Sequence, residues 1–194
     1  MLLEVDLGPR IKALPPRIRV AVAAACAERV LPLFEVMSER GVATARAALR
    51  LAWSWAEGQE IDPRARRSAL STIEELLPKE HDDRGLAVRT LERAGSAIVK
   101  ALEATAIEEA DYSAQAAALS VKMAQAAVHG FELAEDGKMW AMEEQSFQER
   151  MLALAESGDV ARVRAGTKEE KSPSFLDWLE EEWGWDRDDD EGDP

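Results

Sequence analysis

Apolar residues recur at three- and four-residue steps through most of this chain, which is the spacing of one face of an α-helix. Alanine, the strongest helix former, supplies an unusual share of these residues. The β-branched and aromatic residues that favour strands are sparse outside a few places. The sequence therefore predicts an all-α protein, and its first apolar stripe is formed by Ile18, Val22, Cys26, Val30, Leu33 and Met37.

Helix caps and helix breakers divide this pattern into a single bundle of about six to seven helices. Pro15-Pro16 is expected to open the first helix, since proline is tolerated in a first turn, and Pro32 should kink or divide that helix. We expect the alanine-rich helix near 109–133 to lie centrally, because small residues let neighbouring helices approach closely. The later helices are predicted at about 43–57, 63–77, 87–105, 109–133 and 140–154, with a short amphipathic piece at 160–165.

The composition changes after residue 165. Residues 166–173 have the composition of a linker. From Asp177 to Pro194 there are ten acidic residues and one basic residue, a charge of −9 out of the net −14 of the whole chain. We therefore predict a helical bundle domain over residues 1–165, followed by a linker and an acidic, tryptophan-containing tail over residues 166–194.

Charge and composition exclude several classes of partner. A strongly acidic surface repels nucleic acid and anionic membranes, and it attracts a basic protein. The chain has no stretch of about 18 uncharged apolar residues, as a transmembrane helix would need, and residues 1–10 lack the pattern of a signal peptide. Cys26 is the single cysteine, so no intramolecular disulfide can form. We expect a cytoplasmic protein that binds neither nucleic acid nor membrane.

The familiar motifs of catalysis and metal binding are missing from the sequence. There is no glycine-rich phosphate loop and no nucleophile elbow. A helical di-iron site needs a glutamate three residues before each histidine ligand, but Pro78 precedes His81 and Ala126 precedes His129 at that spacing. Cys26 lies on the apolar stripe and is interpreted as a small buried hydrophobe. We therefore expect no catalytic residue, no metal and no cofactor.

Glu143, Glu144 and Glu149 are the carboxylates most open to a chemical interpretation. Paired carboxylates can carry out acid–base chemistry, although a solvated helix face is the simpler interpretation. In a third interpretation, one of them pairs with Arg29, which lies close to the apolar stripe of the first helix. A buried arginine needs such a partner.

The acids of the tail are interleaved with aromatic rings. Tryptophan is costly to expose to water and is enriched at interface hot spots. One interpretation is a partner-binding segment whose charges attract a basic target and whose rings anchor it. The other is that the segment packs on its own bundle. The predicted partner-binding residues are Phe175, Trp178, Glu180, Glu181, Glu182, Trp183, Trp185, Asp186, Asp188, Asp189 and Asp190.

Two segments near the N-terminus carry a family resemblance. Cys-Ala-Glu-Arg-Val-Leu-Pro-Leu-Phe-Glu at 26–35 resembles the opening helix of the fifth-numbered immunity-protein family of bacterial polymorphic toxin systems. Arg-Ala-Ala-Leu-Arg-Leu-Ala-Trp-Ser-Trp-Ala-Glu-Gly at 46–58 is similar to that family's Ala/Arg helix, which ends in Trp, Ala and Gly. The chain also resembles a group of all-helical bacterial proteins in which a Glu-Arg-x-x-Pro segment and a Trp-containing helix are followed by Glu-Glu before an aromatic residue, here residues 143–147.

The motif residues of the opening helix are Glu28, Arg29, Pro32 and Glu35. Arg29 and Pro32 are interpreted as structural first, because motif residues on an apolar stripe usually serve packing. Glu28 and Glu35 are seven residues apart and so share a helix face. They are either solvent-facing contacts or internal salt-bridge partners, and the sequence leaves both readings open.

The resemblance implies a protein that binds a cognate toxin and blocks it without catalysis. Nuclease toxins are usually basic because they bind phosphates. An inhibitor with clustered acidic charge would associate quickly with such a toxin. Our first hypothesis is therefore an immunity protein that neutralises a cognate, basic bacterial toxin such as a nuclease. The alternative is a non-catalytic helical adaptor of the bacterial cytoplasm that uses its acidic tail as a docking motif.

Overall fold

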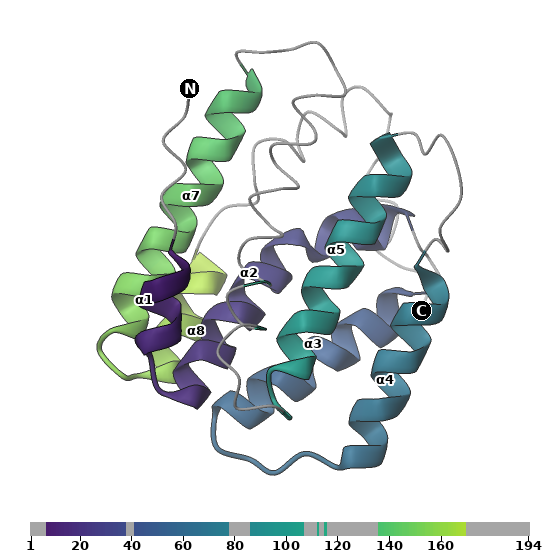
Figure 1. The fold of residues 1–194 in the computed structure, drawn as a ribbon, viewed down its shortest axis with the longest axis horizontal. Helices are drawn as coiled ribbons and strands as arrows, with labels where there is room; N and C mark the ends of the chain where they lie inside the picture. The colour runs from purple at the N-terminus through teal and green to yellow at the C-terminus, as the bar shows by residue number, and fades with distance from the viewer. Residues whose placement is uncertain are drawn as a thin grey trace, which may run out of the picture.

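The computed structural model describes residues 7–37, 41–77, 86–106, 112, 115 and 136–169, which contain helices and no strand (Figure 1). The predicted all-α fold is confirmed. The central helix predicted near 109–133, the two histidines and the tail from residue 170 on lie outside the described residues. The helices are α1 (Gly8–Ala13), α2 (Pro16–Met37), α3 (Val42–Ala56), α4 (Pro63–Leu76), α5 (Leu86–Glu103), α7 (Asp136–Ala155) and α8 (Val160–Glu169).

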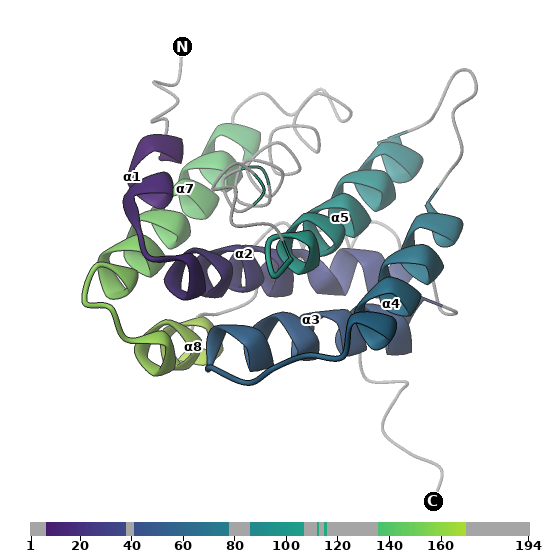
Figure 2. The same cartoon turned by 60° about the horizontal axis from the view of Figure 1, so that its bottom comes forward.

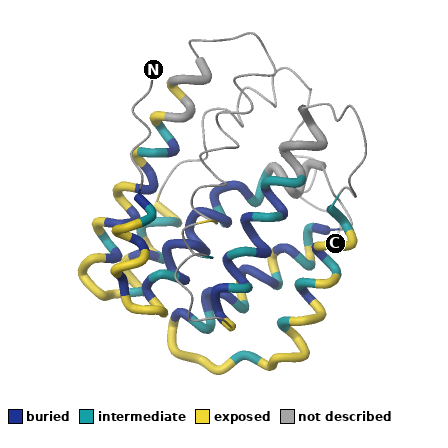
Figure 3. Tube along the Cα trace, in the orientation of Figure 1, coloured by how far each residue is buried: buried dark blue, intermediate teal, exposed yellow. Residues whose placement is uncertain are grey.

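Helix α2 is central to the described part of the fold. It packs against α1, α3, α5, α7 and α8, and Figure 2 shows it running between α3 and α8 on one side and α5 and α7 on the other. Every residue from Val20 to Ala27 is buried, so this stretch is apolar on all sides and not along one stripe as predicted (Figure 3). Five of these eight residues are alanines, whose small side chains let helices approach from several directions.

Helix α2 continues through Pro32 to Met37, so the interpretation that Pro32 divides this helix is wrong. A proline inside a helix removes one backbone hydrogen bond and crowds the preceding turn. Residues on the N-terminal side of Pro32, among them Val30, are fully packed in the core. We infer that packing around α2 offsets the local cost of the proline.

The core has two parts that share α2. One part joins the side of α2 bearing Ala23 and Val30 to α3, α4 and α5. The other joins the side bearing Val22 and Cys26 to α1, α7, α8 and the C-terminal part of α3. Cys26 is fully buried, as predicted for a small apolar residue. Because both parts pack on α2, this helix fixes α3, α4 and α5 relative to α7 and α8.

The ends of α3 and α5 lie close to the predicted bounds, whereas the end of α8 does not. Gly58 ends α3 with a φ of +101°, a conformation that glycine adopts without strain. Helix α5 ends at Glu103, near the predicted break, and the Thr105 hydroxyl donates to the Leu102 carbonyl at 2.7 Å. Helix α8 continues to Glu169, whereas residues 166–169 were expected to belong to the linker. A Cβ at Gly166 would lie 2.5 Å from Leu154 Cδ1, so glycine here allows α8 to pack closely on α7.

Asp62 caps the start of α4: its Oδ1 accepts a hydrogen bond from the backbone N–H of Arg64 at 2.9 Å. Replacing Asp62 by alanine should lower the free energy of unfolding by about 1 kcal/mol, because a backbone donor of the first turn loses its acceptor. Urea denaturation followed by circular dichroism measures the change. Asp62→Asn should retain most of the stability, and the exposed Glu60→Ala should be neutral. An equal loss for Glu60→Ala would mean that charge near α4, and not the cap, is responsible.

None of the helices within the described ranges combines the length and the apolar content that a membrane crossing requires.

Candidate functional site

Arg29 is the centre of a buried polar cluster between α2 and α7. Its Nε donates to Oε2 of Glu144 at 2.7 Å, and its Nη2 donates to Oε1 of Glu143 at 2.9 Å. The side chains of Arg29 and Glu144 are only 4% and 3% exposed, whereas that of Glu143 is 32% exposed. The predicted pairing of Arg29 with a carboxylate of this segment is confirmed. The solvated-face interpretation is wrong for Glu144, because that carboxylate faces the core.

Two neighbours complete the surroundings of this ion pair. The guanidinium of Arg29 lies 4.4 Å from the centroid of the Phe147 ring, a cation–π distance. The side-chain amide of Gln148 donates to Oε1 of Glu144 at 3.4 Å. Both carboxylate oxygens of Glu144 therefore have a donor, as a buried charge requires. The arrangement neutralises the arginine and holds α7 in a fixed position against α2.

A second polar contact joins α2 to α3. The indole N–H of Trp53, a buried residue of α3, donates to Oε2 of Glu28 at 2.7 Å. Glu28 is thus an internal hydrogen-bond acceptor, which favours the internal interpretation of this motif residue, although its partner is an indole and not a base. The side chain of Glu35 lies outside the described residues. We call Glu28, Arg29, Trp53, Glu144 and Phe147 the motif cluster.

Helix α8 covers one side of the motif cluster. The guanidinium of Arg164 lies 5.5 Å from the centroid of the Trp53 ring and forms an ion pair with Glu57 at the end of α3. Nearby, Arg17 of α2 stacks on Trp55 at 5.6 Å and donates to its carbonyl oxygen. These contacts fix the junction of α2, α3 and α8 through aromatic rings and guanidinium groups.

The other predicted residues are exposed, partly buried or outside the described residues. Glu149 is exposed and accepts a hydrogen bond from Gln145 at 3.2 Å, so the solvated-face interpretation holds for it. Pro32 is partly buried in α2. The predicted partner-binding residues from Phe175 to Asp190 lie outside the described residues. Among the residues that the structure describes, no group of three or more His, Cys, Asp or Glu side chains is arranged to hold a metal ion.

The hydrogen-bond partner of Trp53 was not predicted from the sequence. A signal was available, because the N–H of a buried tryptophan normally finds an acceptor, and Glu28 is a motif residue of the helix that α3 packs against. Arg164 was missed altogether. Its role depends on how α8 lies against the end of α3, and local sequence carries no information on that packing.

Comparisons with known proteins bear on the fold. The chain matches no protein-family model, and no curated protein matches it either. Its structure is similar to the crystal structure of a DUF416 family protein from Shewanella baltica, with a TM-score of 0.70 and 20% sequence identity. The similarity covers 85% of this chain and 93% of that protein. At this level of identity, the likeness establishes a shared helical fold.

Proposed function

We propose that this protein is an immunity protein of the bacterial cytoplasm that binds a cognate, basic toxin and blocks it through protein–protein contact. The observation that carries the proposal is the hydrogen bond between Glu28 and Trp53. Glu28 belongs to the first segment that resembles the immunity family, and Trp53 belongs to the second. Their direct contact supports the view that the two matching segments form one structural unit.

The later matching segment is in contact with the same unit. Glu143, Glu144 and Phe147 surround Arg29, which follows Glu28 in the opening helix. The described motif residues thus form two groups at adjacent positions of α2, in which Glu28 binds Trp53 and Arg29 binds the segment 143–147. Their polar atoms hold helices together, which leaves the recognition of a partner to surfaces outside this cluster.

The distribution of charge favours the tail as the recognition element. Residues 1–176 contain 23 Lys and Arg against 28 Asp and Glu, a formal charge of −5. The segment from Asp177 to Pro194 carries −9. A basic toxin domain would therefore be attracted most strongly to the tail, where the negative charge is densest. Acidic side chains would accelerate the encounter, and the rings of Trp178, Trp183 and Trp185 would supply apolar anchors.

Affinity purification followed by inhibition tests this function. Tagged full-length protein is used to isolate its partner from the native lysate, and the partner is identified by mass spectrometry. We expect a basic toxin domain whose activity is abolished when the full-length protein is added at a one-to-one ratio. Recovery of ordinary cellular machinery without a toxin would favour the adaptor. A toxin that is captured but keeps its activity would contradict neutralisation.

The tail's contribution is measured with full-length variants and the purified toxin domain. Trp183→Ala/Trp185→Ala should weaken binding at least about thirtyfold, because a single aromatic hot-spot residue is worth about 2 kcal/mol or more. Isothermal titration calorimetry gives the two dissociation constants. The matched control is Ser172→Ala/Ser174→Ala, which changes the same segment without removing a ring and should bind normally. Equal affinity of the tryptophan variant and the unaltered protein would move the contact surface to the helical domain.

A further inference from the structure

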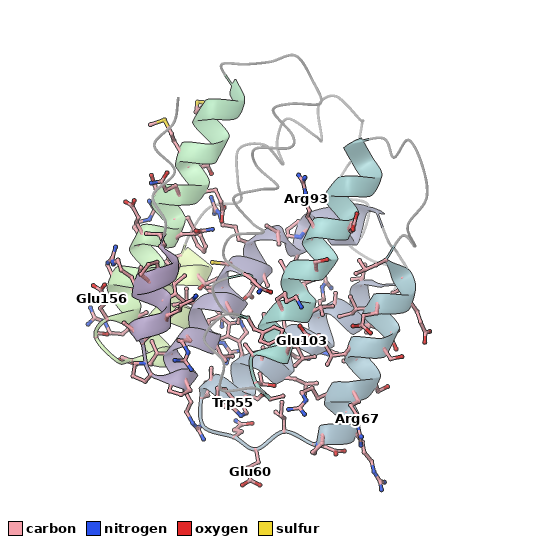
Figure 4. All side chains as sticks on the ribbon, viewed as in Figure 1. Trp55, Glu60, Arg67, Arg93, Glu103 and Glu156 are labelled. Carbon is pink, nitrogen blue, oxygen red and sulfur yellow. The ribbon has the colours of Figure 1, made fainter. Side chains whose placement is uncertain are left out.

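Three arginines form an exposed basic patch at the start of α4. Arg64 and Arg67 are exposed and Arg66 is partly exposed; we call these three residues the arginine patch. Figure 4 shows Arg67 near the start of α4, pointing away from the helices. Within the described part of the chain, none of the three side chains forms a hydrogen bond or an ion pair. Their charges are therefore compensated by solvent alone in this part of the structure.

Beyond the Asp62 cap, the arrangement of charge along α4 is opposite to the one that stabilises a helix. The helix dipole places a partial positive charge at the N-terminus and a partial negative charge at the C-terminus. Cations near the N-terminus and anions near the C-terminus are therefore unfavourable. Helix α4 carries the arginine patch in its first turns, no acid in its first turn, and Glu74 and Glu75 near its end. Arg64 and Arg67 are also three residues apart, so their like charges face each other. An anionic segment lying across the patch would relieve both effects.

The chain itself contains such a segment. The helical domain, residues 1–165, carries a formal charge of −5, so an acidic segment would be attracted to a local cluster of bases such as the arginine patch and not to the domain as a whole. The tail from Asp177 to Pro194 has ten carboxylates and one base. Guanidinium–carboxylate contacts are charge-assisted and frequently bidentate, which makes three clustered arginines a suitable surface for an aspartate- and glutamate-rich strand.

Helix α8, which precedes the tail in the sequence, pairs with the end of α3 from which the chain passes to the patch. Arg164 of α8 pairs with Glu57, and the chain then passes from Glu57 to the cap of α4 at Asp62 (Figure 2). Residues 170–176 separate the end of α8 from the first tail acid, and seven extended residues span up to about 25 Å. The acidic segment from 177 to 193 adds up to about 60 Å. The tail is therefore long enough to lie on α4 of its own chain.

We propose that the acidic tail, Asp177–Pro194, docks on the arginine patch of its own α4 when no partner is bound. Because the tail is tethered to α8, its local concentration at the patch is high and weak individual contacts suffice. The docking does not depend on the proposed function. If the partner is a basic toxin, as in the proposed function, the toxin and the arginine patch compete for the same carboxylates of the tail. The patch then holds the tail until the toxin displaces it.

Paramagnetic relaxation in the isolated full-length protein tests the docking. A nitroxide is attached at Ser68→Cys, an exposed position beside the patch, while the buried Cys26 stays unlabelled. The indole N–H signals of Trp178, Trp183 and Trp185 are then recorded in low salt. We expect these signals to lose intensity near the label and to recover it in Arg64→Gln/Arg66→Gln/Arg67→Gln.

The controls separate docking from general electrostatics. Lys12→Gln/Arg162→Gln/Lys168→Gln removes the same charge from exposed residues elsewhere and should leave the signal loss unchanged. Signals that keep full intensity in the labelled protein, or that lose the same intensity in both triple variants, would overturn the proposal. So would signal loss that appears only when labelled protein is mixed with a separate isotope-labelled copy, since that places the tail on another molecule. All these measurements use the chain without toxin, so their failure leaves the proposed function standing.

Discussion

Replacing Arg29 by methionine should lower the free energy of unfolding by about 3–5 kcal/mol, which is a large part of the stability of a domain of this size. Methionine is apolar and has a similar length to arginine, so the substitution removes the charge with little change of volume. It leaves the Glu144 carboxylate, 3% exposed, without its cation. A buried carboxylate that loses its partner bears most of its desolvation cost uncompensated. Urea denaturation followed by circular dichroism at neutral pH gives the change.

An exposed ion pair provides the matched control. Arg10 pairs with Glu156 at 2.6 Å, but their side chains are 47% and 50% exposed. Arg10→Met should therefore cost about 0–1 kcal/mol, since solvent screens the pair. Arg29→Met/Glu144→Leu should recover much of the lost stability, because replacing both members of a buried pair by apolar groups is often tolerated. A loss for Arg29→Met as small as that for Arg10→Met would contradict the buried position of Arg29.

The pairing of Arg29 with a carboxylate could be predicted from the sequence, because a buried charge requires a partner of opposite charge. The choice among Glu143, Glu144 and Glu149 depended on helical phase. Glu144 is three residues before Phe147 and seven before Met151, and both of those are buried. Position 144 therefore lies on the core-facing side of α7, whereas Glu149 does not. The periodicity of the sequence contained this distinction, although the candidate carboxylates were first considered as one group.

The surroundings of α2 could not be predicted in the same way. Periodicity identifies a face that is buried, but the number of neighbours around a helix is a property of the whole fold. The alanines on the remaining sides of α2, such as Ala21 and Ala25, are equally compatible with an exposed helix because alanine is a strong helix former everywhere. The same limit applies to the end of α8. Gly166 is a residue type typical of linkers, but in the structure it allows α8 to pack closely against Leu154.

Phe147→Ala is expected to have the second large effect, a loss of about 3–5 kcal/mol in the free energy of unfolding. Phe147 is 1% exposed and belongs to the part of the core that joins α2 to α7 and α8. Removing the ring loses its burial and leaves a cavity that the surrounding helices fill only in part. Phe147→Leu retains much of the volume and should cost less. Urea denaturation of both variants, compared with the unaltered protein, measures the difference.

A double-mutant cycle then separates packing from the contact with the guanidinium. The ring of Phe147 lies 4.4 Å from Arg29, and buried cation–π contacts are worth about 2 kcal/mol. If the ring stabilises the charged arginine, the losses for Phe147→Leu and Arg29→Met should sum to more than the loss for the double variant, with a coupling of about 0.5–3 kcal/mol. Strict additivity would mean that Phe147 contributes only its volume, and the orientation of Arg29 would then depend on Glu143 and Glu144 alone. The cycle therefore decides whether the aromatic residue after the Glu-Glu pair positions the arginine or only fills space beside it.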